Sequence, residues 1–177
     1  VVLAGTGVPV EASSLGAFGA DKIVVIEHDA LADYNPEAWV STLEDLILAG
    51  EYGVVVFSAT TLGKDLAPRI AAHLDVPLAS DVTEVAISDG VVSVTRPVFS
   101  GKAFAHLEID ASPALISIRP NVFPSVEWAA EGEVTTVTPD LNVSDFRVRV
   151  VERESSSDGV VDVSEASVIV SGGRGMK

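Results

Sequence analysis

The C-terminal residues Ser171–Lys177, with the sequence Ser-Gly-Gly-Arg-Gly-Met-Lys, combine a glycine cluster with a basic side chain. They follow an apolar run, Ala166–Val170, that predicts a buried strand. A glycine cluster after a strand lets a phosphate or a flat ring approach the backbone closely. Arg174 adds a permanent charge and a rigid fork of hydrogen-bond donors. These residue types therefore predict a contact with an anionic or ring-shaped ligand.

A second candidate ligand site is the segment Ser58–Arg69, which follows an apolar strand and opens a helix. Open α/β sheets bind ligands at this carboxyl edge, and the hydroxyls and free N–H groups of a helix start can hold a phosphate. However, the sequence contains neither G-x-x-x-x-G-K-[ST] nor G-x-G-x-x-G. The alternative is that Thr60 or Thr61 caps the helix while Lys64 and Arg69 lie at the surface, and the spacing favours it.

Three further basic residues lie at predicted strand ends. Arg96 and Lys102 flank a turn, and Arg119 closes an apolar strand. Pro97 and Pro120 follow two of them and stop the strands. Ion pairs with the many carboxylates would contribute little at a surface. Because the three cations leave neighbouring sheet elements, a ligand site or a subunit contact stays open as the alternative.

The sequence argues against metal-dependent, hydrolytic and nucleic-acid functions. It has no cysteine, which excludes disulfides, thiolate zinc sites and cysteine nucleophiles. His28, His73 and His106 show no metal-ligand spacing. Asp81 and Glu84 have no partner acid for paired-carboxylate hydrolysis, and no G-x-S-x-G motif occurs. The net charge of −15 disfavours phosphate-rich partners, which need clustered cations.

Apolar strands alternate with amphipathic helices in the first part of the chain. Continuous Val and Ile strands indicate a parallel sheet covered on both faces. The chain has 177 residues, and no apolar stretch approaches the length needed to span a membrane. We predict an α/β fold, a three-layer α/β/α Rossmann-like domain with a mainly parallel sheet plus a small antiparallel sheet. The predicted strands are Val1–Ala4, Lys22–Glu27 and Val54–Phe57, and the predicted helices are Glu11–Phe18, Pro36–Leu48 (with Gly50 just past its end) and Thr60–Leu74.

The pattern changes after Pro77 to alternating apolar and polar residues separated by turn signals, which is typical of antiparallel hairpins. Phe146–Glu152 also alternates and predicts a strand. The polar stretch Ser155–Gly159 predicts a flexible junction close to a domain boundary. The predicted antiparallel segments are Val82–Ser88, Gly90–Pro97, Lys102–Ile109 and Ala114–Arg119, the last of them including a buried strand, Ala114–Ile118.

Taken together, several segments resemble the α subunit of electron transfer flavoprotein, in order and spacing across nearly the whole chain. The segments are Leu15–Lys22, Ser58–Arg69 with Asp81–Val82, Thr95–Ala103 with Ser117–Phe123, and Ser171–Lys177. The resemblance implies that residues 1–164 form the family's N-terminal α/β domain without its first strand and helix. It implies that residues 165–177 start a C-terminal FAD-binding domain whose remainder is absent.

The resemblance also implies a cofactor and partners. It carries over Arg174 as an FAD contact, with Gly172, Gly173 and Gly175 letting the cofactor approach. The expected protein is an electron carrier rather than a stand-alone enzyme. It would pair with a β subunit, which holds AMP, and take electrons from acyl-CoA-type dehydrogenases of fatty acid β-oxidation to a membrane quinone reductase.

The expected location is the bacterial cytoplasm, or the mitochondrial matrix in a eukaryote. Two other readings remain open. One is a small nucleotide-binding or regulatory α/β module with its phosphate site at Thr60–Arg69, and the other is a structural subunit without a cofactor.

Overall fold

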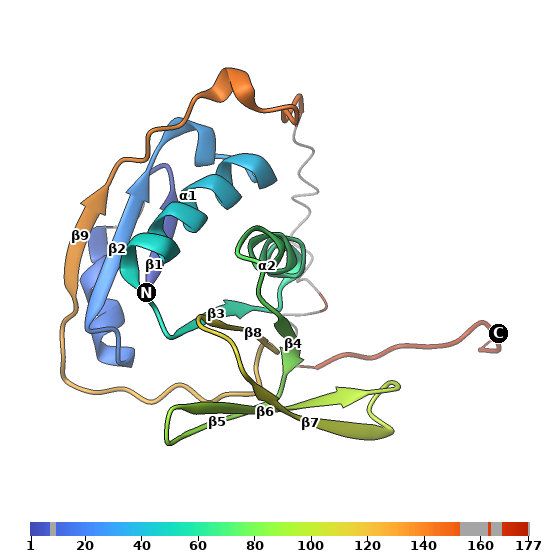
Figure 1. Cartoon of the computed structure of the whole chain (residues 1–177). Coiled ribbons are helices and arrows are strands. Elements are labelled where there is room, and N and C mark those ends of the chain that lie inside the picture. Colours follow the sequence, from blue (N-terminus) through green and yellow to red (C-terminus); the bar gives the residue numbers. More distant parts are fainter. Residues whose placement is uncertain (8–9, 153–162, 164–167, 177) are drawn as a thin grey trace.

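The computed structural model describes residues 1–7, 10–152, 163 and 168–176 (Figure 1). No helix in these ranges is long and apolar enough to cross a membrane. The helices are η1 (Val10–Phe18), η2 (Asp29–Leu31), α1 (Pro36–Gly50), α2 (Thr61–His73) and η3 (Val143–Asp145), where η marks a 3-10 helix. The strands are β1 (Val2–Gly5), β2 (Lys22–Glu27), β3 (Val54–Ser58), β4 (Leu78–Val82), β5 (Glu84–Ser88), β6 (Val91–Val98), β7 (Ala103–Ile109), β8 (Ala114–Ile118) and β9 (Glu133–Val137).

One parallel sheet has the strand order β1-β2-β9. In its register, Val24 of the central strand lies opposite Val2 and Thr135. Because side chains alternate along a strand, those of β2 pack into two separate apolar cores, one on each face of the sheet. Ile23 packs in the cluster that includes η1 residues, and Ile26 packs in the cluster that includes α1 residues.

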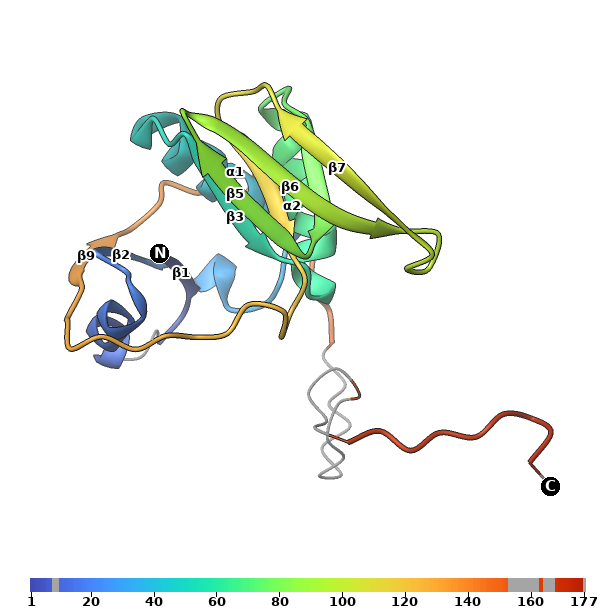
Figure 2. The same cartoon turned by 90° about the horizontal axis from the view of Figure 1, so that it is seen from below.

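A second parallel sheet has the order β3-β8-β4. Its central strand β8 is buried on both faces. Leu115 packs with residues of α1 and α2, whereas Ala114 and Ile116 pack with residues of β6. The helices therefore cover one face of this sheet and the antiparallel sheet β5-β6-β7 covers the other (Figures 1 and 2). This arrangement confirms the predicted α/β Rossmann-like class, with parallel strands and a separate antiparallel sheet.

Helix α1 begins as predicted and ends differently. Asn35 Oδ1 accepts hydrogen bonds from the backbone N–H groups of Glu37 and Ala38, at 3.0 and 3.3 Å. We expected Gly50 beyond the helix, but Gly50 is its last residue and Glu51 takes the left-handed backbone, with φ 46°. A Cβ at position 50 would lie 2.1 Å from the ring of Tyr52. A larger residue at position 50 would therefore need the exposed Tyr52 ring to move aside.

Three strand predictions were wrong. Ala114–Arg119 was grouped with the antiparallel hairpins, yet β8 runs parallel to both of its neighbours. Val82–Ser88 was predicted as one strand, but the chain forms the parallel strand β4 and then the antiparallel strand β5. The change of partner follows an irregularity between Ala79 and Val82, where Asp81 has a φ of 58°. A bulge of this kind bends a strand and redirects it.

The third wrong prediction is a strand over Phe146–Glu152, which is irregular in the structure. The carboxylate of Glu37 accepts hydrogen bonds from the backbone N–H groups of Arg147 and Val148, at 2.6 and 3.1 Å. These donors are thus satisfied by a side chain at the start of α1 instead of by a strand. The strand that pairs at this end of the chain is β9, which the sequence analysis missed because Glu-Val-Thr-Thr-Val is neither a continuous apolar run nor an alternating one.

The predicted short helix Glu11–Phe18 is confirmed as the 3-10 helix η1. One other expectation needs correction. A buried strand was expected over Ala166–Val170, but the described part, residues 168–170, is irregular and Val170 is 95% exposed. No strand in the described part of the chain pairs with it. Ala166 and Ser167, like the predicted junction Ser155–Gly159, lie outside the described residues.

Helix α2 sits directly on the end of β3. A Cβ built at Gly63 would lie 1.8 Å from the carbonyl oxygen of Ser58. This position in the first turn of the helix is therefore open only to glycine while the backbone stays where it is. Gly63 sets how closely the start of α2 approaches the edge of the sheet.

We predict that Gly63→Ala lowers the free energy of unfolding by about 1–3 kcal/mol, since overlap with the Ser58 carbonyl forces α2 away from β3. Helix propensity alone would favour alanine by about 1 kcal/mol, so the sign of the change identifies the contact. Urea unfolding followed by circular dichroism measures it. Gly53→Ala is the control, because no atom lies within 4 Å of its added Cβ. Equal stability of the two variants would contradict the prediction.

Candidate functional site

The carboxyl ends of β3, β8 and β4 meet at one edge of their sheet, because the three strands are parallel. Two backbone hydrogen bonds join the segments that leave this edge. Ala59 N–H donates to the Ile118 carbonyl at 2.7 Å, and Arg119 N–H donates to the Val82 carbonyl at 2.9 Å. Side chains that follow the three strands are therefore held in fixed relative positions.

Asp81 and Arg119 form a two-pronged ion pair at this edge. Arg119 Nε donates to one carboxylate oxygen of Asp81 at 3.0 Å, and Nη2 donates to the other. The hydrogen bond from Arg119 lowers the pKa of Asp81, and the positive charges of Arg119, Lys64 and Arg96 lower it further. The same pairing raises the pKa of Arg119. Asp81 is thus an ionised carboxylate at neutral pH and not a proton donor.

The backbone of Asp81 has a strained conformation, and this conformation directs its side chain toward Arg119. Its φ of 58° is unusual for a residue other than glycine. Its N–H donates to the hydroxyl of Ser117 at 3.1 Å, and Ser117 is 2% exposed. A buried hydroxyl on β8 therefore supports the bulge in β4 that turns Asp81 toward Arg119.

Lys64 and Arg96 bring two more positive charges to Asp81, from α2 and β6. Lys64 is exposed and Arg96 is half-buried. The Arg96 Nε atom is buried and has no hydrogen-bond partner among the described residues. Of the three cations predicted at strand ends, the structure thus places Arg96 and Arg119 around one carboxylate. Lys102 is exposed in the turn between β6 and β7 and is not among the charges that lower the pKa of Asp81.

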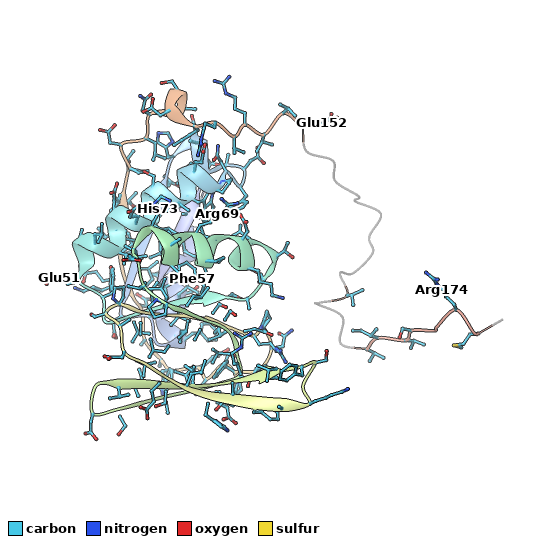
Figure 3. All side chains as sticks on the ribbon, turned by 45° about the vertical axis from the view of Figure 1, so that its right-hand side comes forward. Glu51, Phe57, Arg69, His73, Glu152 and Arg174 are labelled. Atoms are coloured by element: carbon cyan, nitrogen blue, oxygen red, sulfur yellow. The ribbon has the colours of Figure 1, made fainter. Side chains whose placement is uncertain are left out.

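The start of α2 is capped, as the spacing favoured. Thr60 Oγ1 accepts a hydrogen bond from Gly63 N–H at 3.2 Å. Arg69, on the same helix (Figure 3), donates two hydrogen bonds of 3.0 Å to the carboxylate of Asp65, which also accepts one from Tyr34. Burial of Tyr34, together with this hydrogen bond, raises the pKa of its phenol. These groups form hydrogen bonds within the fold, and none of them is arranged to hold a phosphate.

The three histidines have separate roles. His28 Nδ1 accepts a hydrogen bond from Ala30 N–H and caps η2. His73 Nδ1 lies 2.9 Å from a carboxylate oxygen of Glu44, and His106 Nδ1 lies 2.9 Å from the hydroxyl of Thr95. Within the described ranges, no three histidine, aspartate or glutamate side chains form a group able to hold a metal ion.

The glycine–arginine segment lies apart from the sheet edge. Figure 3 shows Arg174 on an extended part of the chain, away from the side chains of the α/β body. Arg174 is exposed, and Gly173 accepts a hydrogen bond from Met176 N–H at 3.1 Å. A Cβ added at Gly173 or Gly175 would meet no atom within 4 Å, and one at Gly172 would meet only the flexible side chain of Met176. The structure therefore does not join this segment to the other candidate residues.

Comparison with known families identifies the chain. A family model described as the electron transfer flavoprotein domain matches residues 1–142, which is most of the sequence. The chain belongs to the electron transfer flavoprotein family. The family is named for its flavin, and the resemblance seen in the four sequence segments is confirmed.

The curated relatives of this chain include proteins named as electron transfer flavoprotein subunit alpha and one named as an electron transfer subunit beta. The electron transfer flavoprotein subunit alpha of Bacillus subtilis (strain 168) is 35% identical over 177 residues, which cover 99% of this chain and 54% of the relative. The subunit alpha of Megasphaera elsdenii is 33% identical over 180 residues, covering 99% and 53%. The acryloyl-CoA reductase electron transfer subunit beta of Anaerotignum propionicum is 29% identical over 204 residues, covering 99% and 56%. The chain thus spans about half the length of these relatives.

Sequence reasoning found two of the residues at the flavoprotein chain's sheet edge and missed how they are connected. Asp81 was considered as a member of an acid pair with Glu84 and as part of a family-like segment. Lys64 was considered as part of the candidate phosphate segment or as a surface residue. A signal was present, because Asp81 ends a strand and is followed by a change of residue pattern. Its pairing with Arg119, 38 residues away, needed the parallel insertion of β8.

We predict that Arg119→Met lowers the free energy of unfolding by about 1 kcal/mol at pH 7, a value that allows for partial exposure of the ion pair. The folded-state pKa of Asp81 lies below its ordinary value of 3.8. The pair therefore stabilises the fold above pH 3.8, and this contribution is lost as the pH falls through the lower folded-state pKa. The gap between wild type and variant should close under acid conditions.

Urea unfolding at a series of pH values tests this. Arg149→Met, which removes an exposed arginine from an irregular segment, is the control and should differ from wild type by less than about 0.5 kcal/mol. A gap for Arg119→Met that does not change with pH would show that the substitution acts through packing instead of through Asp81.

Proposed function

We propose that this chain is the N-terminal part of an electron transfer flavoprotein α subunit. With a β subunit, the whole protein carries electrons on one non-covalently bound FAD. The observation that carries the proposal is the match along 99% of the chain to relatives named as electron transfer flavoprotein subunit alpha.

The sheet edge supports an electron carrier better than an acid–base catalyst. Asp81 is held ionised by Arg119, and the carboxylate of Asp65 is held by Arg69 and Tyr34. Carboxylates with lowered pKa values do not donate protons near neutral pH. The residues of this segment therefore provide a scaffold, and a bound flavin would supply the redox chemistry.

Arg174 is the residue we assign to the cofactor, with Gly172, Gly173 and Gly175 beside it. The local structure is compatible with this role. Arg174 is exposed, and the space next to Gly173 and Gly175 is open, so a ring or a phosphate can reach the backbone. One charge-assisted hydrogen bond contributes about 1.5–3 kcal/mol, which is too little to retain a flavin. The remaining contacts would come from residues outside this chain.

We also propose that residues 1–164 form the N-terminal α/β domain and that residues 165–177 start the FAD domain. The edges of the two parallel sheets support the part of this proposal in which the N-terminal domain lacks the family's first strand. β1 and β3 are both edge strands, and an apolar groove of about 590 Å³ lies between them. Val2 and Val56 on these edges are 38% and 53% exposed. The family's first strand would cover both.

The electron donors and acceptors are also part of the proposal. We assign acyl-CoA-type dehydrogenases of fatty acid β-oxidation as donors, a membrane quinone reductase as the acceptor, and AMP to the β subunit. The relative from Anaerotignum propionicum is named for an acryloyl-CoA reductase, which suits an acyl-CoA-linked partner. The proposed location is the bacterial cytoplasm, or the mitochondrial matrix in a eukaryote.

The proposal predicts a flavin spectrum. The full-length gene product, co-expressed with its β subunit and purified, should be yellow and should bleach on reduction. Visible absorption spectroscopy measures this, and released flavin identified by chromatography should be FAD. A complex that is colourless and remains so after added FAD would overturn the proposal. Calorimetric titration of the chain with ATP and AMP would then test the nucleotide-binding module.

In that full-length complex, Arg174→Ala should weaken FAD binding by about 10- to 100-fold, the loss of one charge-assisted contact. It should also lower the flavin midpoint potential, because a nearby positive charge favours the reduced, more negative forms. Flavin dissociation measured by fluorescence and a redox titration provide the two readouts. Arg149→Ala, which removes another exposed arginine, is the matched control. Unchanged affinity and potential would remove Arg174 from the site.

A further inference from the structure

The segment that follows β9 passes the start of α1 on the outside of the molecule without joining a sheet (Figure 1). We call residues 138–152 the strap. Its one regular element is the 3-10 turn η3. Its residues are exposed except for Pro139, Leu141 and Phe146, which are partly buried. The strap is therefore attached by contacts other than a β-ladder.

The carboxylate of Glu37, in the first turn of α1, accepts three hydrogen bonds from the strap. Its Oε2 accepts from the backbone N–H groups of Arg147 and Val148, at 2.6 and 3.1 Å, and its Oε1 accepts from Arg147 Nε at 3.1 Å. The hydrogen bond from Val148 N–H is the main cause that lowers the pKa of Glu37. The carboxylate is therefore ionised near neutral pH, and bonds to a charged acceptor are stronger than bonds between neutral groups.

Asn35 binds the strap at the same point and also caps α1. Its Nδ2 donates to the Val148 carbonyl at 2.9 Å, while its Oδ1 accepts from the N–H groups of Glu37 and Ala38. The hydrogen bonds that Asn35 and Glu37 make to the strap thus all reach two consecutive residues, Arg147 and Val148. We call Asn35 and Glu37 the latch.

Two apolar side chains of the strap add to this attachment. Leu141 and Phe146 pack against the core that contains residues of α1 and α2, but both stay partly exposed. Leu31 and Ile70 of the same core are at most 1% exposed. Segments with few buried apolar contacts open at a lower free energy than the core does. The strap therefore has the features of a unit that opens locally.

The strap forms one wall of a cavity at the carboxyl end of β1. The cavity has a volume of about 580 Å³, and its lining includes Gly5, Thr6 and Tyr34 together with Val150 and Glu152 of the strap. In parallel α/β sheets this end of the strands is where ligands bind. Opening of the strap would therefore change access to this end of the β1-β2-β9 sheet.

We propose that the strap opens as a unit while the α/β body stays folded, and that the latch of Asn35 and Glu37 sets how often it opens. Opening removes Val150 and Glu152 from the wall of the cavity. It also releases the chain from the end of β9 onward, which lengthens the connection between the body and residues 165–177. The significance of that longer connection rests on the proposed function, in which residues 165–177 start the FAD domain, whereas the opening itself does not.

Limited trypsin digestion of the full-length protein with its β subunit tests the latch. Cleavage after Arg147 or Arg149 requires the strap to leave the body, so its rate follows the open population. In Glu37→Ala this cleavage should be about tenfold faster or more, because the variant loses three hydrogen bonds to a charged acceptor. Fragment masses identify the cleaved bonds. Asp45→Ala, which removes an exposed carboxylate from the same helix, is the control and should be cleaved like wild type.

Asn35→Asp separates the latch from the helix cap. Aspartate caps a helix about as well as asparagine, but its carboxylate cannot donate to the Val148 carbonyl. Cleavage of the strap should therefore be about two- to tenfold faster, while the melting temperature of the complex stays unchanged. Cleavage after Lys64 or Arg69 in α2 reports unfolding of the body, and its rate should stay at the wild-type value in both latch variants.

The results separate this inference from the proposed function. Equal cleavage of the strap in Glu37→Ala and Asp45→Ala, in a yellow complex, would overturn the inference and leave the proposed function standing. Cleavage of Glu37→Ala that accelerates equally in the strap and in α2 would also overturn it, because the strap would then open only with the body. If the latch variants are cleaved faster in the strap alone but the wild-type complex stays colourless after added FAD, the inference stands and the proposed function fails.

Discussion

The burial of β8 between β3 and β4 is the constraint on which the rest of the structure depends. The chain leaves the parallel sheet after β4, builds the antiparallel sheet, and returns to place β8 in the centre. Leu115 and Ile116 are each no more than 1% exposed and face opposite sides. One short strand therefore joins the helix-covered core to the core under the antiparallel sheet. Its apolar residues must be buried on both faces, and that requirement holds the two halves together.

The chemistry of the sheet edge follows from this insertion. Because β8 runs parallel to its neighbours, it delivers Arg119 to the same edge as Asp81 and the start of α2. Its Ser117 hydroxyl supports the bulge at Asp81. The polar groups at the edge are mostly bonded to one another, which keeps them rigid and keeps Asp81 ionised. Such an edge suits a platform for a partner or a cofactor-bearing domain better than a site for proton transfer.

β1 and β3 contrast with this central strand. Both are apolar and both stand at sheet edges, with a groove between them. Apolar strands exposed at an edge are prone to unwanted pairing, and proteins normally protect them. The groove is bounded on its helical side by residues of α1, including Trp39, whose indole Nε1 is buried without a partner in the described ranges. The unpaired edges and the buried, unpaired indole nitrogen occur at the same place.

Local patterns in the sequence predicted the elements that depend on neighbours along the chain. β2 and the starts of α1 and α2 were predicted correctly, because a continuous apolar run or a capping residue determines each of them locally. The α/β class and the family also follow from residues that are visible in the sequence. The sequence analysis was wrong where a residue pattern indicated a strand but the backbone of that segment bonds to a partner other than a strand. Phe146–Glu152 alternates like a strand, but the carboxylate of Glu37 binds its backbone donors.

The candidate site shows the same difference between local features, which the sequence predicts, and contacts that depend on the tertiary structure. The sequence by itself indicated Arg119 at a strand end and a cap at Thr60 or Thr61, because a strand end and a helix cap are local features. Only the tertiary structure decided that Arg119 pairs with Asp81, that the charges of Lys64 and Arg96 also act on Asp81, and that Arg174 lies apart from the pair. The physical reason is that strand order and direction bring together residues that are distant in the chain, and burial on both faces of a sheet selects that order.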